Sequence, residues 1–218
     1  MDCYIFGAGE PSLPTVLPPR DGVLVIAADG GYRVAVRAFG APDLLVGDLD
    51  SIEKIPEDVP TLRYPREKDE TDLALAARLA VGRGCRRLRI FSALGGRLDH
   101  TVANLQLLAG LADDGIEATL HGADGTVALV LSAGKEALFS SAFSGTLSVF
   151  AFGGLARDVT LSGLRYPLTG ATLDPTVPLG VSNELLGEEA SVSLGEGRLL
   201  LLYKSEACRT PTVRNRTV

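Results

Sequence analysis

The pattern of apolar segments changes near residue 132, and this change constrains the fold more than any other feature. Before it, apolar runs of strand length alternate with segments of helix length, as in residues 22–28 followed by 32–39. Such alternation is typical of a mostly parallel sheet with helices on both faces. After it, short apolar runs are separated by Gly, Pro and Ser, which is typical of a small antiparallel sandwich. We therefore predict an α/β domain over residues 1–132 and a smaller all-β sandwich domain over residues 133–218.

The individual elements follow from the same pattern. In the first domain, the expected strands are residues 3–7, 22–28, 41–47, 58–64, 86–94, 116–120 and 126–131, and the expected helices are residues 32–39, 73–82 and 102–111. In the second domain, the expected strands are residues 144–150, 158–162, 166–168, 190–194 and 198–203. The basic tail over residues 208–218 is expected to be frayed.

Composition argues against several classes of protein. The net charge of −6 and the pI near 5.0 argue against nucleic acid as the main partner. No apolar run is long enough to cross a bilayer, and residues 1–9 favour a first strand over a signal peptide because they begin with an acid rather than a base. Cys3, Cys85 and Cys208 are far apart and form no CxxC pair, which favours reduced thiols over zinc or disulfides. We expect a cytoplasmic protein without a membrane partner.

Carboxylates follow the ends of two predicted strands. Asp29 ends the apolar run 22–28 and precedes two glycines, whereas Asp48 and Asp50 follow the run 41–47. Ligands of open α/β sheets gather at the carboxyl ends of strands. Alternate residues of an extended segment point the same way, so Asp48 and Asp50 can face one cation. The alternatives are a helix cap for Asp29 and a solvated turn for the other two.

Two further polar loops adjoin predicted helices. Thr71 can cap the helix that follows it, and Asp72 lies in its first turn, where the backbone also accepts anions. Arg97 follows two glycines at a strand end and suits bidentate contact with phosphate. His100 is either a phosphate donor or a helix cap, His121 is interpreted as structural, and the Gly7–Gly9 turn either contacts a nucleotide or only redirects the chain.

These loops together predict a class of chemistry. Their acids are Asp29, Asp48, Asp50, Asp69, Asp72 and Asp99. Close carboxylates repel one another, so a cleft that holds several of them needs cations. Lys68 and Arg97 supply contacts for phosphate, and no P-loop, kinase signature or Ser-His-Asp arrangement is present. The residues therefore predict a magnesium-dependent enzyme that acts on a phosphorylated substrate such as ATP.

The ordered set of motifs resembles one family. The segments are DGG at 29–31, GDLDS at 47–51, KDETD at 68–72, GGRLDH at 95–100, SGLRYPL at 162–168 and GVSNE at 180–184. In this order they resemble thiamine pyrophosphokinase (thiamine diphosphokinase) over nearly the whole chain. The resemblance implies an α/β domain, a β-sandwich and a homodimer. It also implies transfer of pyrophosphate from ATP to the hydroxyl of thiamine, with release of AMP.

The resemblance also implies roles for individual residues. The expected magnesium ligands are Asp48, Asp50 and Asp72, and the expected catalytic residues are Asp48, Asp50, Asp72, Asp99 and Arg97. The expected binding residues are Asp29, Lys68, Thr71, Arg97, His100, Ser182 and Asn183. In this family, Ser182 and Asn183 would border a thiamine pocket at the dimer interface. The chain has no Trp to stack on thiamine, and Tyr203 is the nearest candidate for that role.

Two other functions are compatible with parts of the pattern. A pyrophosphokinase for another hydroxymethyl heterocycle, such as a pterin, would share the acidic motifs, but the segment at 182–184 in a β-sandwich argues against it. A non-enzymatic nucleotide or metal sensor would need fewer carboxylates. In the last strand, Leu199, Leu201 and Tyr203 alternate with Leu200 and Leu202, so both faces are apolar. One face is expected to fill the sandwich core, and the other to be covered by a partner subunit or by the first domain.

Overall fold

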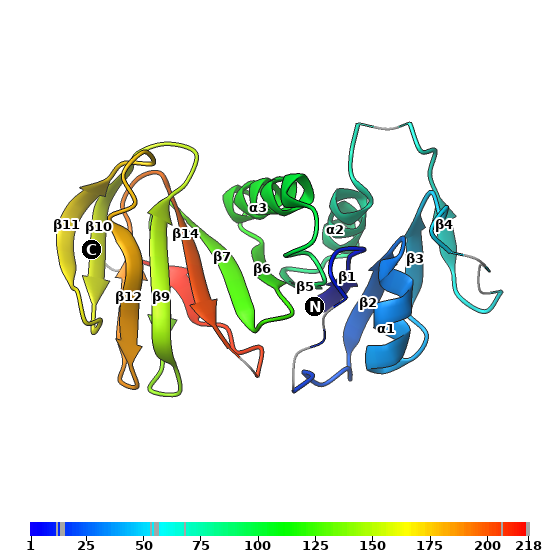
Figure 1. Ribbon diagram of the computed structural model, residues 1–218, viewed down its shortest axis with the longest axis horizontal. Coiled ribbons are helices and arrows are strands. Elements are labelled where there is room, and N and C mark those ends of the chain that lie inside the picture. The colour runs from blue at the N-terminus through cyan, green and yellow to red at the C-terminus, as the bar shows by residue number, and fades with distance from the viewer. Residues whose placement is uncertain are drawn as a thin grey trace. The chain divides into compact units, whose positions relative to one another are not determined.

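The computed structural model describes residues 1–11, 13, 16–52, 54, 57–67, 69–205 and 207–216. It consists of two compact units, Met1–Gly125 and Thr126–Val218, whose elements are labelled in Figure 1. The division lies at Gly125 rather than at residue 132. The reason is that β7 (Thr126–Ser132) pairs along its whole length with β14 (Arg198–Lys204), so it belongs to the second unit.

The first unit is built on a parallel sheet. Its strands are β1 (Asp2–Phe6), β2 (Val23–Ala28), β3 (Leu44–Gly47), β4 (Thr61–Arg63), β5 (Arg87–Phe91) and β6 (Glu117–His121). They lie in the order β6-β5-β1-β2-β3-β4, and each neighbouring pair is parallel. Ile5, Ile26 and Leu45 at the centre of this sheet have no exposed surface. Burial on both faces explains why these strands are continuous apolar runs.

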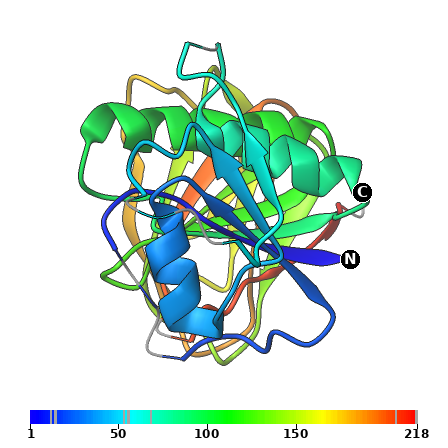
Figure 2. The ribbon, with the colours of Figure 1, turned by 90° about the vertical axis from the view of Figure 1, so that its right-hand side faces the viewer.

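The helices of this unit cover both faces of its sheet. They are α1 (Gly31–Phe39), α2 (Asp72–Gly82) and α3 (Leu98–Asp113). Figures 1 and 2 show α2 and α3 side by side, on the face opposite α1. Right-handed crossovers explain this, because α1 connects strands in one direction along the sheet, whereas α2 and α3 connect strands in the other. The direction of winding therefore reverses at β1, and such reversal points open a crevice at the carboxyl ends of the strands.

The starts of the three helices test the predicted caps. Thr71 caps α2 as predicted, since its Oγ1 accepts a hydrogen bond from the backbone N–H of Ala74 at 3.2 Å. Gly30 is the N-cap of α1, so the predicted capping alternative for Asp29 is wrong. Helix α3 begins at Leu98 rather than at 102, and its N-cap is Arg97, so His100 does not cap it. Leu98 is 76% exposed, which hid this first turn from the apolar pattern.

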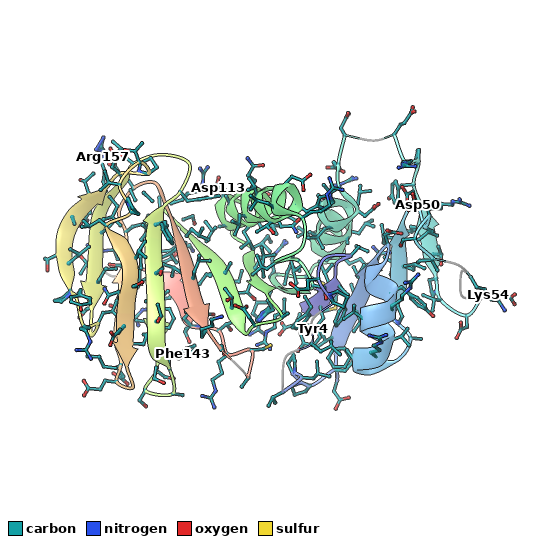
Figure 3. All side chains as sticks on the ribbon, viewed as in Figure 1. Tyr4, Asp50, Lys54, Asp113, Phe143 and Arg157 are labelled. Atoms are coloured by element: carbon teal, nitrogen blue, oxygen red, sulfur yellow. The ribbon has the colours of Figure 1, made fainter. Side chains whose placement is uncertain are left out.

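The second unit is an all-β sandwich. Its strands are β7, β8 (Lys135–Phe139), β9 (Ser144–Ala151), β10 (Ala156–Ser162), β11 (Leu168–Leu173), β12 (Gly180–Leu186), β13 (Ala190–Ser193), β14 and β15 (Thr212–Asn215). Within this unit they form antiparallel sheets in the orders β12-β9-β14-β7 and β11-β10-β13-β8-β15. One apolar core, with side chains from both sheets such as Leu129, Phe139, Leu161 and Leu201, lies between them. Phe143 of this core is labelled in Figure 3.

Three expectations about this unit are wrong. The strand expected over residues 166–168 does not form there, because β11 begins at Leu168 and runs to Leu173. The described part of the tail, residues 208–216, is not frayed, because β15 pairs with β8, and both Nε and Nη2 of Arg214 donate to Glu136 Oε2 at 3.0 Å. Tyr203 is 2% exposed and packs edge-on against Phe139 and Phe143, so its ring is part of the core and cannot stack on a ligand.

The opposite face of β14 is unevenly covered, since Leu202 there is only half-buried. Leu200 is only 6% exposed within a single chain.

Among the described residues, no helix is long and apolar enough to span a membrane. Cys3, Cys85 and Cys208 are all buried, and no disulfide joins them in the described part of the chain.

His121 is the buried histidine at the end of β6, and its predicted structural role agrees with its contacts. Its ring is 3% exposed, stacks on Phe91 with centroids 5.0 Å apart, and places Nε2 2.9 Å from Thr119 Oγ1. Burial lowers the pKa of His121 from 6.5 to about 3.

This pKa shift predicts how stability depends on pH. As the pH falls below 6.5, the unfolded chain binds a proton that the folded chain excludes, so folding stability is lost towards pH 3. Between pH 7 and pH 5, His121 is expected to remove about 2 kcal/mol from the free energy of unfolding. Urea unfolding of the protein and of a His121→Gln variant at both pH values measures this loss. If the free energy of unfolding of the variant falls by the same amount between the two pH values, the pH dependence does not come from His121.

Candidate active site

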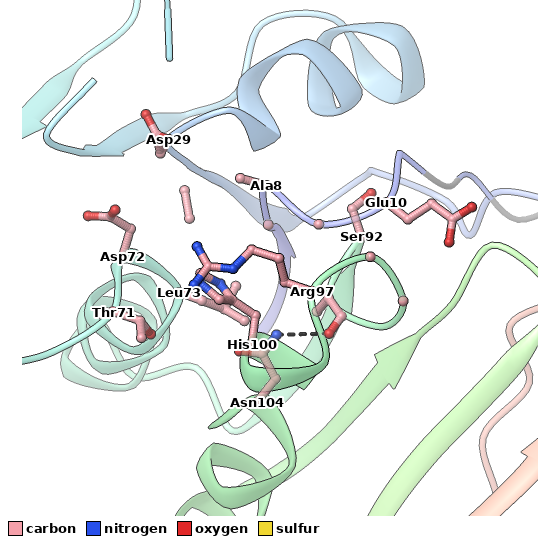
Figure 4. A pocket seen from close by; sticks show the side chains of 16 residues that line it. Ala8, Glu10, Asp29, Thr71, Asp72, Leu73, Ser92, Arg97, His100 and Asn104 are labelled. Carbon is pink, nitrogen blue, oxygen red and sulfur yellow. Dashed lines mark hydrogen bonds between the residues drawn. The ribbon is translucent and has the colours of Figure 1, made fainter. Parts of the chain in front are cut away.

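A cavity of about 550 Å³ opens at the carboxyl ends of β1, β2 and β5, where the winding of the sheet reverses. Its lining comes from the loops after these strands and from the first turns of α2 and α3. Figure 4 shows Asp29, Asp72, Arg97 and His100 around it. The other lining residues are Gly7, Ala8, Gly9, Glu10, Ala28, Thr71, Leu73, Ser92, Ala93, Gly95, Gly96 and Asn104.

Asp29, Asp48 and Asp50 form the acidic centre of this region. Among the described residues, one carboxylate oxygen of each lies within 4.8 Å of the others. Oδ1 of Asp29 is buried and has no hydrogen-bond partner in the described part of the chain. Three carboxylates this close repel one another unless a cation lies between them. Their oxygens are the ligands that hard divalent cations prefer, so the donor set fits such an ion.

The backbone of the loop after β3 brings two of these carboxylates together, but not in the predicted way. The segment is not extended, because Leu49 has φ 65° and turns the chain in the left-handed region. The Leu49 side chain is 4% exposed and anchors the turn in the core. The backbone N–H of Asp50 donates to Asp48 Oδ1 at 3.1 Å. Asp48 is therefore half-buried, while Asp50 projects outward beyond β3 (Figure 3).

Close packing of two strand ends places Asp29 beside this turn. The backbone N–H of Asp29 donates to the carbonyl of Val46 at 2.8 Å. A Cβ atom at Gly47 would lie 3.1 Å from the Asp29 Cβ and 3.3 Å from its backbone, at a φ of 148°. Glycine is therefore required at position 47 for the ends of β2 and β3 to approach.

The predicted metal ligand Asp72 lies elsewhere. It is not part of the group within 4.8 Å, although it lines the same cavity as Asp29, and both residues are drawn in Figure 4. Thr71 lines the cavity while capping α2. Lys68, the predicted phosphate contact of the same loop, lies outside the described residues. Arg66 from this loop approaches Asp50 at 3.8 Å.

Arg97 and Asp99 form an exposed pair at the start of α3. Nε and Nη2 of Arg97 donate to the two carboxylate oxygens of Asp99 at 3.2 and 2.6 Å. Asp99 Oδ1 also accepts the backbone N–H of His100 at 3.0 Å. The Arg97 hydrogen bonds lower the pKa of Asp99, and Asp99 raises the pKa of Arg97. Asp99 therefore stays ionised and holds the guanidinium in a fixed direction.

Sequence reasoning did not assign Ser92, Asn104 or Glu10 to the site. Ser92 is fully buried with φ 54°, and Asn104 Nδ2 donates to the carbonyl of the adjacent Ala93 at 2.8 Å. The N–H groups of Gly7 and Gly9 donate to Phe91 and Ser92 at 2.9 Å, which holds the loops after β1 and β5 together. These two amides are therefore occupied, and the turn does not offer them to a phosphate. Glu10 could have been assigned to the site from the sequence, because this acid directly follows the Gly7–Gly9 turn.

Comparison with known proteins gives this site a family. The profile described as the thiamin pyrophosphokinase catalytic domain matches residues 20–120. The profile described as the thiamin pyrophosphokinase vitamin B1 binding domain matches residues 137–199. This chain belongs to the thiamin pyrophosphokinase family. The catalytic match includes the acidic centre and the Arg97–Asp99 pair. It also includes the first turns of α2 and α3, which line the cavity.

Individual members of the thiamin pyrophosphokinase family resemble the chain over most of its length. The thiamine pyrophosphokinase of Bacillus subtilis is 29% identical over 189 residues, which are 84% of this chain and 88% of that protein. The crystal structure from Geobacillus thermodenitrificans has a TM-score of 0.76 at 28% identity and covers 95% of this chain and 99% of that one. The Bacillus subtilis crystal structure has a TM-score of 0.82 at 24% identity, covering 94% and 99%, and supports the fold alone.

The predicted thiamine residues lie in the second unit, within the vitamin B1 binding match. Ser182 is exposed and has φ 58°, and its backbone N–H donates to Ser148 Oγ at 3.1 Å. Asn183 is 3% exposed, and its side-chain amide is bonded to the backbone of Tyr166. The two predicted residues therefore differ, since Ser182 presents its side chain to solvent and Asn183 does not.

A second cavity of about 320 Å³ adjoins the first across the Gly7–Gly9 turn. Arg33 and Arg37 line it from α1, and Ser51 lines it from the loop after β3. Arg33 Nη2 donates to the carbonyl of Ser51 at 2.8 Å, which ties that loop to α1. The acidic centre is thus flanked by a cationic cavity, which the sequence prediction did not include.

Proposed function

We propose that this chain is a magnesium-dependent thiamine diphosphokinase that transfers pyrophosphate from ATP to the hydroxyl of thiamine and releases AMP. The observation that carries the proposal is the acidic centre of Asp29, Asp48 and Asp50, at the strand ends of a chain with both domains of this family. The proposed protein is cytoplasmic and homodimeric. The dimer, with thiamine bound at its interface, rests on the family resemblance.

The acidic centre is proposed to hold magnesium. Asp29, Asp48 and Asp50 would be the ligands, because they are close and because Asp29 Oδ1 is buried without a hydrogen bond. Asp72 would act from its separate position in the first turn of α2. A bound magnesium ion would supply positive charge against the oxygens of the triphosphate.

The remaining residues are proposed to position the phosphates. Transfer of this kind depends mainly on in-line alignment and on stabilisation of charge. Thr71 and the N–H groups at the start of α2 suit an anion. Lys68 and His100 are proposed as further phosphate contacts. Arg97 would meet the charge that develops in the transition state through N–H groups that Asp99 leaves open. Asp99 is proposed to position Arg97, since its carboxylate accepts two N–H groups of the guanidinium.

The proposed reaction is tested by incubating the protein with ATP, magnesium and thiamine. We expect AMP and thiamine diphosphate in equal amounts, and no product when magnesium is chelated. A hydroxymethyl pterin in place of thiamine tests the alternative pyrophosphokinase, which the vitamin B1 binding match makes the weaker candidate. Folded protein that binds ATP but forms neither product would instead support a sensor.

Arg97→Lys is expected to lower kcat at saturating ATP at least about tenfold. A lysine provides one point charge and cannot both bind Asp99 through two N–H groups and contact a phosphate. A lost charge-assisted hydrogen bond accounts for this decrease. The matched control is Arg86→Lys, an exposed arginine before β5, which should keep its rate. Full activity of the Arg97→Lys variant at saturating ATP would show that Arg97 does not contact the transition state.

A further inference from the structure

Asn104 is a polar side chain in the apolar stripe of α3. The buried residues of this helix are Asn104, Leu108 and Leu111, whose spacing of four and three positions places them on one face. Asn104 is 8% exposed and lines the large cavity. A buried amide costs free energy unless it is hydrogen-bonded, whereas an apolar side chain would simply continue the stripe. The amide at this position therefore needs an explanation.

The hydrogen bond of Asn104 joins the second turn of α3 to the end of a central strand. Its Nδ2 donates to the carbonyl of Ala93 at 2.8 Å (Figure 4). Ala93 is 3% exposed and directly follows Ser92, where the chain leaves β5 with φ 54°. The amide thus reaches from the helix to the point at which the strand becomes the loop that lines the cavity.

The loop after β1 holds the same strand end from another side. The backbone N–H groups of Gly7 and Gly9 donate to the carbonyls of Phe91 and Ser92, each at 2.9 Å. A Cβ atom at Gly9 would lie 2.5 Å from the carbonyl oxygen of Ser92, so the two segments are in close contact. Three consecutive carbonyls, from Phe91 to Ala93, therefore accept hydrogen bonds from other elements. The end of β5 is a fixed point beside the cavity.

The loop between this fixed point and α3 carries Arg97. Gly95 and Gly96 have φ 83° and 67° and are exposed. Arg97 is the N-cap of α3, and its guanidinium is bonded to Asp99. Among the described residues, the side-chain hydrogen bonds of this pair stay within residues 97–100. The position of the pair relative to the strand ends therefore depends on where α3 begins.

We propose that Asn104 is a positioning residue for the transfer of pyrophosphate, and that it acts by holding the start of α3, and with it Arg97, beside the cavity. This inference rests on the proposed function. Leu108 and Leu111 bury the later turns of α3, whereas Asn104 ties its early turns to β5. A displacement of about 1 Å at a reacting group can lower a rate about a hundredfold. Loss of this bond should therefore lower kcat without removing a contact to either substrate.

Asn104→Leu tests the inference, because it continues the apolar stripe and removes the donor. We expect kcat, measured at saturating ATP and thiamine with magnesium, to fall at least about fivefold, and both KM values to change less than about twofold. Asn104→Ala removes the same donor without adding volume, so it should give the same result and replaces the leucine variant if that one does not fold.

The matched control is Leu108→Ala, one turn further along the same face of α3. Leu108 is 1% exposed, and truncating a buried leucine leaves a cavity that destabilises the fold strongly. Its urea midpoint should therefore fall further than that of Asn104→Leu, while its kcat should stay normal. The two variants are expected to rank in opposite order by stability and by rate, which a purely structural role of Asn104 would not produce.

A double-mutant cycle with Arg97→Lys shows through which residue Asn104 acts. If Asn104 works by positioning the guanidinium, its replacement has little left to disturb once the guanidinium is gone. We expect Asn104→Leu to lower kcat less than about twofold in the Arg97→Lys background. An equal decrease in both backgrounds would show that Asn104 acts independently of Arg97, and the inference would be wrong.

The remaining outcomes separate this inference from the proposed function. If the unaltered protein makes thiamine diphosphate and the Asn104 variants keep its kcat, the bond is only structural, so the inference is overturned and the function stands. A higher KM for ATP or thiamine at unchanged kcat would make Asn104 a substrate contact, which also overturns the inference. If the unaltered protein forms no product, the proposed function is wrong, and the inference is wrong with it because no transfer depends on Arg97.

Discussion

Asp50→Asn is expected to lower the rate of thiamine diphosphate formation at least about a hundredfold while the protein stays folded. The amide keeps the size of the side chain but removes one of three negative charges within 4.8 Å. Loss of a metal ligand removes several kcal/mol of transition-state stabilisation. Asp50 is exposed and its approach to Arg66 is long, so folding should be unaffected. Initial rates with ATP, thiamine and magnesium measure the effect, and circular dichroism checks the fold.

The matched control is Asp114→Asn, which removes an exposed acid at the end of α3, outside the residues that line the cavity. It should keep its full rate. Asp48→Asn should behave like Asp50→Asn, and both should need more magnesium for half-maximal rate. Nearly normal turnover by a folded Asp50→Asn protein would show that the acidic centre does not take part in the reaction.

Gly31→Ala is expected to lower the free energy of unfolding by about 3 kcal/mol or more, at the upper end of overpacking costs. A Cβ atom at this position would lie 2.0 Å from the carbonyl oxygen of Phe6 and 2.8 Å from that of Gly7. Both atoms belong to the backbone at the end of β1, which cannot move aside as a flexible side chain would. Helix α1 would have to shift away from the sheet. Urea unfolding measures the loss.

Gly110→Ala is the control for this substitution. Gly110 lies within α3, and a Cβ atom there would have no neighbour within 4 Å. Replacing a helical glycine by alanine in open space stabilises a helix by up to about 1 kcal/mol. The two changes should therefore shift the urea midpoint in opposite directions. Equal midpoints for Gly31→Ala and the original protein would mean that α1 is not packed as closely on β1.

The sequence contained enough to predict the layers of the fold. The run at 22–28 is apolar at every position because β2 is buried on both faces, and Thr71 caps α2 because its hydroxyl precedes an apolar helix. Both signals are local. The grouping of Asp48 with Asp50 was also predictable, although the reason was different, since Leu49 turns the chain rather than extending it.

The rest depended on contacts that are distant in sequence. Asp29 joins Asp48 and Asp50 because β2 and β3 are neighbours and Gly47 lets them approach, whereas Asp72 starts a helix elsewhere around the cavity. The order of the strands in the sheet determines which carboxylates meet, and no local sequence pattern indicates that order. Asn183 likewise has the composition of a polar ligand contact, but the backbone it binds lies 17 residues earlier in the chain.

The last strand is expected to lower the tendency of the protein to aggregate. β15 lies at the end of its sheet and covers one edge of β8, where backbone groups would otherwise be unpaired. Exposed edges of this kind pair with strands of other molecules and begin aggregation. Arg214 and Arg216 tether this cover through Glu136 and Asp158. We therefore expect a chain shortened before Thr212 to aggregate more readily, because the backbone groups along this edge of β8 would be exposed.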